Sequence, residues 1–243
     1  MIKNYLFLLV SLIFLLDSGC GLNDDEGIFG CMDGEGETIT EELVLADFSK
    51  IKLKTSADVY LTQGDVQKVE VKGQQNIIHQ LDLDVNGETW EIEFDDCVRN
   101  YDDLKIYITI PEIKELNISG SGMIYGENDL EVGDFRLRIS GSGDIDLVLD
   151  AGDIDSKITG SGRIKLEGSS TRFQLQISGS GDYRAFDLDT EDGGIKITGS
   201  GDAEVSVSDE LDIEISGSGD IYYKGNPALR EDITGSGDVI DAN

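Results

Sequence analysis

Apolar and polar residues alternate along most of the chain, and in the second half one five-residue motif interrupts this alternation at regular intervals. The motif reads Ile-Ser/Thr-Gly-Ser-Gly and occurs seven times, with successive Ile residues 21, 19, 19, 20, 18 and 18 positions apart. A repeat period near 20 residues is typical of solenoids, in which each repeat forms one coil. The motif begins at Ile118, Ile139, Ile158, Ile177, Ile197, Ile215 and Ile233.

The segments on both sides of each motif have the pattern of β-strands. In the second copy, Leu137 and Ile139 flank a polar residue before the motif, and Ile145 and Leu147 flank another after it. Period-two alternation predicts strands with one buried face. The sixth residue after each motif Ile forms a second interior column, made of Ile124, Ile145, Ile164, Tyr183, Ala203, Ile221 and Val239.

These two columns predict the fold. Parallel strands joined by successive crossovers wind right-handed in nearly all known cases. We therefore predict an all-β chain whose residues 117–243 form a right-handed parallel β-helix, or β-solenoid, of about seven coils. At about 4.8 Å per coil the rod should be about 34 Å long.

The motif itself predicts a tight corner between the two strands of each coil. Gly at two alternating positions permits positive φ angles or a close approach between coils. The Ser between them is present in all seven copies, and we expect its hydroxyl to bond to the Ser of the neighbouring coil. A catalytic role for this Ser is disfavoured, because the chain has a single His and none accompanies the repeats.

Residues 37–116 also alternate but contain no repeat. The pair Asn86-Gly87 lies between two alternating runs and predicts a hairpin, on whose second strand Trp90 should face the core. We predict that residues 37–116 form a β-rich N-terminal cap that covers or continues the first coil of the solenoid.

The first residues have the pattern of an export signal. Lys3 precedes a 12-residue run from Tyr5 to Leu16 that is apolar except for Ser11, and this run is too short to cross a bilayer as a helix of about 20 residues. The small residues just before Cys20 resemble the lipobox of bacterial lipoproteins, although Asp17 stands where a Leu is usual. We predict a lipoprotein signal peptide at residues 1–19 and a lipid on Cys20, with ordinary secretory cleavage as the alternative.

An acidic segment follows this cysteine. The run Asp24-Asp25-Glu26 resembles a surface-export signal of lipoproteins in one group of Gram-negative bacteria, and a solvated tether is the plainer interpretation. We predict that residues 20–36 are an acidic tether. The protein should then be lipid-anchored at the cell outer membrane, facing either the periplasm or the cell surface.

Net charge and cysteine content limit the possible partners of the chain and the chemistry of its cysteines. The chain has 50 Asp and Glu against 19 Lys and Arg, a net charge of −31 that disfavours nucleic acid as a partner. Beyond Cys20 only Cys31 and Cys97 remain. In an oxidising envelope two such residues most simply form a disulfide, and the alternative is two buried thiols.

The order of motifs resembles a known family, the "putative auto-transporter adhesin, head GIN domain". The resemblance is carried by Ala46-Asp-Phe-Ser-Lys-Ile-Lys-Leu, Val59-Tyr-Leu-Thr-Gln-Gly-Asp, Val69-Glu-Val-Lys-Gly, Tyr107-Ile-Thr-Ile-Pro-Glu-Ile and the Ser-Gly-Ser-Gly series, and it covers residues 38–240. It implies a β-solenoid protein of the bacterial surface or envelope and no reaction. Relatives often pair a Cys before the first strand with one after a Trp-containing hairpin, which fits Cys31 and Cys97.

We therefore expect a non-enzymatic, adhesin-like envelope protein with no cofactor and no catalytic residue, attached to the membrane by its lipid and binding an envelope protein or a glycan. One alternative is an enzyme that acts on polysaccharides, as many β-helices do. The basic residues of the repeats are few and scattered, however, and a strongly negative chain repels an anionic glycan.

The second alternative is a calcium-binding solenoid, because an Asp often follows the Gly-Ser-Gly corner. We expect these residues to form a column of solvated carboxylates in which Arg163 neutralises one end. Any calcium site there should be weak, since calcium requires six to eight oxygen ligands. The candidate cation ligands are Asp182, Asp202, Asp220 and Asp238.

Overall fold

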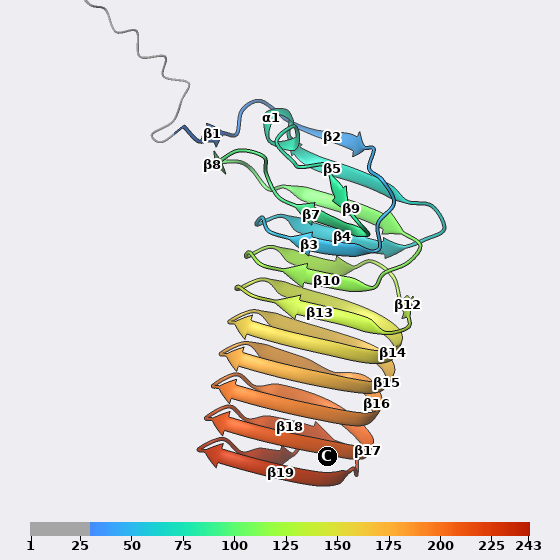
Figure 1. Ribbon diagram of the computed structural model, residues 1–243, viewed down its shortest axis with the longest axis vertical. Helices are drawn as coiled ribbons and strands as arrows, with labels where there is room; N and C mark the ends of the chain where they lie inside the picture. Colours follow the sequence, from blue (N-terminus) through green and yellow to red (C-terminus); the bar gives the residue numbers. More distant parts are fainter. Residues whose placement is uncertain (1–29) are drawn as a thin grey trace, which may run out of the picture.

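The protein is a flattened β-solenoid capped at one end (Figure 1). The computed structural model describes residues 30–243, so the predicted signal peptide, Cys20 and most of the acidic tether lie outside the described residues. In Figure 1 the near strands run left toward the motif corner and the more distant strands run back, while the chain descends. The winding is therefore right-handed, and the predicted fold class is confirmed.

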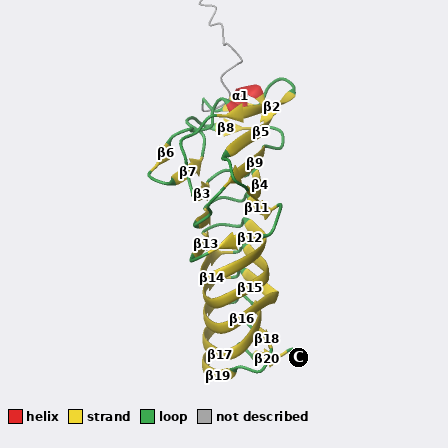
Figure 2. Ribbon diagram, turned by 90° about the vertical axis from the view of Figure 1, so that its right-hand side faces the viewer, coloured by secondary structure: helices red, strands yellow, loops and turns green. Residues whose placement is uncertain are grey.

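Two facing sheets form the walls of the rod, as the side view in Figure 2 shows. Sheet A contains the strands that lead into the motif corner: β7 (Thr89–Ile92), β3 (Lys50–Leu53), β10 (Glu115–Ile118), β13 (Phe135–Ile139), the second halves of β14 (Asp144–Gly160), β15 (Arg163–Gly179), β16 (Asp182–Gly199) and β17 (Ala203–Gly217), and β19 (Ala228–Gly235). Sheet B contains the strands that leave it: β9 (Lys105–Ile110), β4 (Asp58–Gln63), β11 (Met123–Gly126), the first halves of β14–β17, β18 (Ile221–Lys224) and β20 (Val239–Asp241).

The two predicted interior columns are present. In sheet A, Ile139 pairs with Ile158, and the register continues through every later motif Ile. In sheet B, Ile124 pairs with Ile145, and this column continues to Val239. The members of both columns are buried until the last coil. Each coil therefore contributes one residue to each column, and these residues pack at sheet spacing; the sheet A column is Ile throughout, whereas the sheet B column also contains Tyr, Ala and Val.

The corners are joined through their backbones. Ser161 donates its backbone N–H to Gly141 O at 3.0 Å, and Ser180 donates to Gly160 O at 2.9 Å. No hydrogen bond between neighbouring corner hydroxyls occurs in residues 30–243, so the predicted hydroxyl ladder is wrong. Gly160 has a φ of +129°, and a Cβ there would lie 2.4 Å from Gly141 O. Glycine is therefore required by the close approach of one corner to the next.

The N-terminal part extends the solenoid and then closes it. β3 and β4 form a coil that pairs with β10 and β11 on one side and with β7 and β9 on the other, so the spatial order differs from the chain order. The next strands are antiparallel: β5 (Lys68–Gln74) covers β9, and β2 (Thr38–Leu43) covers β5. The hairpin strand β6 (Val85–Asn86) pairs with β7, and the short helix α1 (Gln75–Ile78) lies beside β2 and β5. The predicted N-terminal cap is confirmed.

The corner of the β3–β4 coil lacks glycine. Its residues Thr55 and Ala57 occupy the positions of the two motif glycines. No corner stacks above it, because β7 and β9 are joined by a long loop that contains β8 (Val98–Arg99). A Cβ at Gly120, one coil below, would meet Thr55 O at 2.7 Å. The glycine motif therefore begins where one corner first lies on another.

The first described residues are fixed to the cap. β1 (Met32–Asp33) pairs with β8, and a disulfide joins Cys31 to Cys97 with a Cα–Cα distance of 4.6 Å. Trp90 is fully buried, as its place in the alternation predicts, and its indole N–H donates to Asp82 O at 2.9 Å. In residues 30–243 no helix is long and apolar enough to cross a membrane.

We expect Gly160→Ala to lower the free energy of unfolding by about 2–4 kcal/mol, because the new Cβ combines an unfavourable φ with a backbone collision. Gly133→Ala is the matched control. No atom lies within 4 Å of a Cβ at that position, so the change should stay within about 0.5 kcal/mol. Urea unfolding followed by circular dichroism measures both, and equal effects would contradict the stacking argument.

Candidate functional site

The Asp residues that follow the corners form a column on the edge of sheet B. Met123, Asp144, Arg163 and Asp182 are paired from strand to strand in this column. In the lower coils, Asp220 donates its backbone N–H to Asp202 Oδ1 at 2.8 Å. Asp238 N donates to Asp220 Oδ1 at 2.9 Å in the same way. Each of these carboxylates therefore accepts a backbone hydrogen bond from the next coil.

Arginine neutralises the upper end of this column, as predicted. Arg163 Nη1 lies 3.6 Å from Asp144 Oδ2, and its Nε lies 3.9 Å from Asp182 Oδ2. Asp182 also faces Arg184 Nη2 at 3.5 Å. Asp202 and Asp220 thus have partners that the sequence does not indicate, because a backbone N–H leaves no trace in a residue pattern.

The arrangement provides no ready metal site. In residues 30–243 no three His, Cys, Asp or Glu side chains converge as metal ligands. The single histidine, His79, lies on the surface with its Nε2 3.3 Å from Glu41 Oε2. Calcium binding by Asp182, Asp202, Asp220 and Asp238 remains a hypothesis that depends on the column alone.

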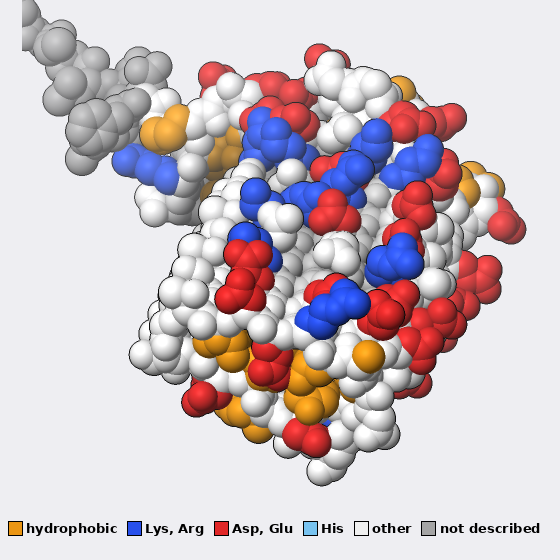
Figure 3. Space-filling model, turned by 60° about the horizontal axis from the view of Figure 1, so that its bottom comes forward, with side chains coloured by type: hydrophobic (Ala, Val, Ile, Leu, Met, Phe, Trp, Pro, Cys, Tyr) orange, Lys and Arg blue, Asp and Glu red, His pale blue; other side chains and the backbone are white. Residues whose placement is uncertain are grey.

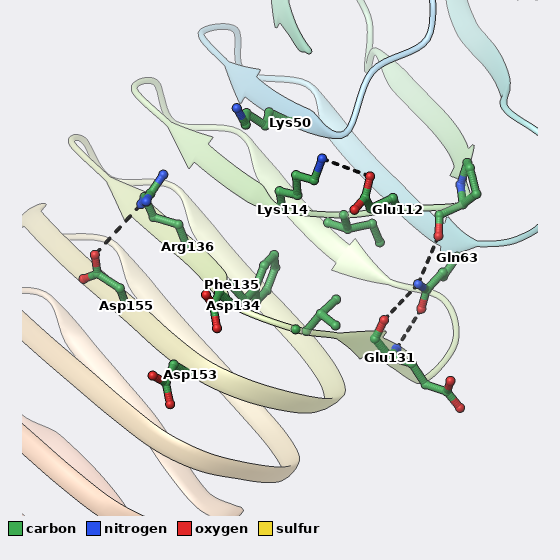
Figure 4. A pocket seen from close by; sticks show the side chains of 14 residues that line it. Lys50, Gln63, Glu112, Lys114, Glu131, Asp134, Phe135, Arg136, Asp153 and Asp155 are labelled. Atoms are coloured by element: carbon green, nitrogen blue, oxygen red, sulfur yellow. Dashed lines mark hydrogen bonds and ion pairs between the residues drawn. The ribbon is translucent and has the colours of Figure 1, made fainter.

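A larger feature lies at the opposite corner of the coils, where the copy with the longest spacing has two extra residues in the loop before β12 (Leu130–Val132) (Figure 4). Gln63 fixes this insertion: its Nε2 donates to Pro111 O and to Glu131 O, and its Oε1 accepts from Glu131 N at 2.7 Å. Asn128 Nδ2 donates to Gln63 O at 3.0 Å. The held loop forms one wall of a cleft of about 720 Å³ with Phe135 in its lining.

The cleft carries both charges. Lys114 Nζ lies 3.0 Å from Glu112 Oε2 and 3.1 Å from Glu88 Oε1. Hydrogen bonds from Lys114 and then Lys50 lower the pKa of Glu88 below its usual value, and Glu112 and then Glu88 raise the pKa of Lys114. These groups therefore stay ionised through the neutral range.

Arg136 completes this wall, bound to Glu115 at 3.1 Å. The cleft lining contains no Ser, Thr, Cys or His, so its reactive side chains are carboxylates, lysines and one arginine. Paired opposite charges around a polar hollow suit non-covalent recognition of a polar partner. The sequence did not indicate this cleft, because an inserted loop and a distant Gln63 create it together.

An aromatic row on sheet B was also missed. Tyr60 stacks on Tyr107 with ring centroids 5.0 Å apart and on Tyr125 at 5.7 Å. Tyr107 is 39% exposed. Each of the three tyrosines is the third residue of its sheet B strand, and the strands are paired in register. A Tyr at the same position of successive strands is the sequence signal that could have located this row. Tyr183, by contrast, is buried, as its interior column predicts.

The basic residues of the repeats are less scattered than the sequence suggests. Arg136, Arg138, Lys157, Lys196 and Arg230 all lie on outward positions of sheet A, and Figure 3 shows Lys and Arg interleaved with Asp and Glu on one face of the rod. Lys196 binds Glu214, and Arg230 binds Asp212 at 3.4 Å. The face is therefore mixed in charge.

A family model described as "putative auto-transporter adhesin, head GIN domain" matches residues 47–227. The chain belongs to this family. No curated protein matches it. Among solved structures, the head GIN domain chain is similar to a putative adhesin from Bacteroides fragilis, with 26% identity, a TM-score of 0.81 and coverage of 86% of this chain and 99% of that one.

Two proteins from Parabacteroides distasonis are also similar in structure. A putative lipid binding protein has 26% identity and a TM-score of 0.74, with coverage of 86% of this chain and 99% of that one. A putative adhesin has 27% identity and a TM-score of 0.71, with coverage of 86% and 98%. The head GIN domain family and the β-solenoid fold are thus both established for this chain, and its relatives carry names of adhesion and binding proteins.

We expect Asp202→Asn and Asp220→Asn to leave the melting temperature unchanged or slightly higher, because the amide oxygen still accepts the backbone N–H while the repulsion between carboxylates disappears. Asp202→Ala, which also removes the acceptor, should melt lower. Thermal melting in EDTA and in millimolar calcium tests the alternative. A calcium-specific rise that both Asn variants abolish would contradict the solvated column.

Proposed function

We propose that this protein is a non-enzymatic, adhesin-like lipoprotein of the bacterial outer membrane that presents a rigid β-solenoid to a protein or glycan partner. The membership of the head GIN domain family carries this proposal. The cleft beside β12 is lined by paired opposite charges, Lys114 with Glu112 and Arg136 with Asp155, and this supports a role in binding.

The geometry of the rod suits presentation. The chain enters the described structure beside β1, at the capped end, and the last coil lies at the opposite end (Figure 1). A lipid on Cys20, joined to the cap by the residues that precede β1, would place the cap toward the membrane. The two sheets, the mixed-charge face and the cleft would then project away from it.

Recognition is assigned to the cleft between β4, β12 and β13. Arg136 of β13 pairs with Glu115 of the neighbouring strand β10, and Lys114, just before β10, pairs with Glu88 in the β6–β7 turn. The charged groups are therefore held in ion pairs before a partner arrives. Fixed groups lose less conformational entropy on binding. A partner that offers both an acidic and a basic or hydroxyl group would match the lining.

The anchor is tested by Cys20→Ser. The wild-type protein should incorporate labelled palmitate and sediment with membranes, whereas the variant should take up no label and appear in the periplasm or the medium, because a thioether-linked lipid requires the thiol. Western blotting of the fractions measures the distribution. A variant that still sediments with membranes, beside a wild type without label, would disprove the anchor.

The partner is sought by probing a glycan array and capturing envelope proteins with the purified chain. We expect Arg136→Ala to weaken capture about tenfold, because it removes a charge from the cleft wall. Arg184→Ala on sheet B changes the net charge equally and should have no effect. The same glycans are assayed for released reducing sugar, and release by the wild type would contradict a non-enzymatic role.

A further inference from the structure

The last coil has an open edge. In the described chain β19 pairs only with β17, and β20 pairs only with β18. Ile233 of β19 is 39% exposed, whereas the earlier motif Ile residues of this column are buried to within 1%. Apolar side chains accordingly reach the surface at this end of the rod in Figure 3. An unpaired strand of this kind is a template for another strand.

The two edges of this coil are not equally available. On the β20 side, Asn243 binds the coil above: its Oδ1 accepts from Gly225 N at 2.9 Å and its Nδ2 donates to Gly225 O at 2.9 Å. β20 is also only three residues long, against eight for β19. The long free edge is therefore that of β19.

A charge stands in the interior column of this edge. Glu231 pairs with Ile213 of the previous coil and therefore occupies an inward position. The inward residues on either side of it in β19 are Leu229 and Ile233. An inward carboxylate on an edge strand is a known obstacle to uncontrolled pairing. The edge thus presents an apolar, an acidic and an apolar side chain to whatever lies below it.

A second copy of the chain does not satisfy this pattern. Antiparallel pairing that keeps the inward faces together and engages seven of the eight residues of β19 centres on Glu231 or Asp232, and either choice sets two carboxylates directly opposite one another. At the other end of a second copy the outermost strand is β2, which carries Glu41 and Glu42 and has no Lys or Arg to face Glu231. The occupant must carry the opposite charge.

We propose that the free edge of β19 binds an extended segment of another protein, which adds to sheet A as a further strand and places a Lys or Arg between two apolar residues. The basic side chain would face Glu231, and the apolar ones would face Leu229 and Ile233. Backbone hydrogen bonds would supply affinity, and these three positions would supply selectivity. The proposal stands independently of the lipid anchor.

The test uses the purified full chain and three labelled nine-residue peptides of alternating Thr and apolar residues. The first has Lys at the centre, the second has Glu there, and the third keeps Lys but has Pro at two consecutive positions, which removes backbone donors. By fluorescence anisotropy in 150 mM salt, the Lys peptide should bind about tenfold more tightly than either of the others.

Two variants of equal charge separate this site from the general negative field. Glu231→Lys should reverse the preference toward the Glu peptide, whereas Asp187→Lys, an exposed position in another coil, should leave the preference for Lys intact. Circular dichroism checks that both variants fold. Equal binding of the Pro peptide, or a Glu231→Lys variant that still prefers the Lys peptide, would overturn the proposal. The proposal would also be overturned if the wild-type protein formed a dimer that Ile233→Asp dissociated, because a second copy of the chain would then occupy the edge.

Discussion

The rod depends on the direct stacking of one Gly-Ser-Gly corner on the next. Neighbouring coils are separated by the spacing of a β-sheet, about 4.8 Å, and the corner backbones hydrogen-bond across that gap. A Cβ at Gly160 or Gly199 would collide with the carbonyl oxygen of the preceding corner. The strands on both sides can keep their register only because the corners come this close. The interior columns, the outer charge rows and the length of each coil all follow from that register.

The same register places residues of successive coils directly next to one another. Each surface of the rod avoids repulsion between such neighbours in a different way. On sheet A, many neighbouring positions carry an acidic residue opposite a basic one and form ion pairs, such as Lys52 with Glu91. On the edge of sheet B, where acidic residues follow one another, carboxylates accept backbone N–H groups. The tyrosines Tyr60, Tyr107 and Tyr125 stack ring on ring. Exposed ion pairs contribute little stability individually, so their main effect is to permit the register.

The sequence predicted what repeats and could not predict what occurs once. The seven motif copies were sufficient for the fold class, the winding and both interior columns. The coil of β3 and β4 was assigned only to a β-rich cap, because its corner at Thr55 and Ala57 needs no glycine. The cleft was not predicted, since it arises from one inserted loop and the side chain of Gln63. The spatial order of β7, β3 and β10 was also inaccessible, because alternation does not reveal which coil lies on which.

Within the core, the stacked coils preserve total volume rather than residue identity. Tyr183 interrupts a column of Ile, and the next residue of that column is Ala203. The hydroxyls of Tyr183 and Ser156 are buried without a hydrogen-bond partner of normal geometry in the described chain. Burial raises the pKa of the Tyr183 phenol well above its usual value. The ring of Phe173 occupies space that a Cβ at Gly193 would need, with ring atoms 2.7 Å away. A large residue in one coil is therefore accommodated by a small one in the next. An interior built in this way can vary its sequence while both outer faces keep one fixed spacing, and that spacing is what a binding partner would meet.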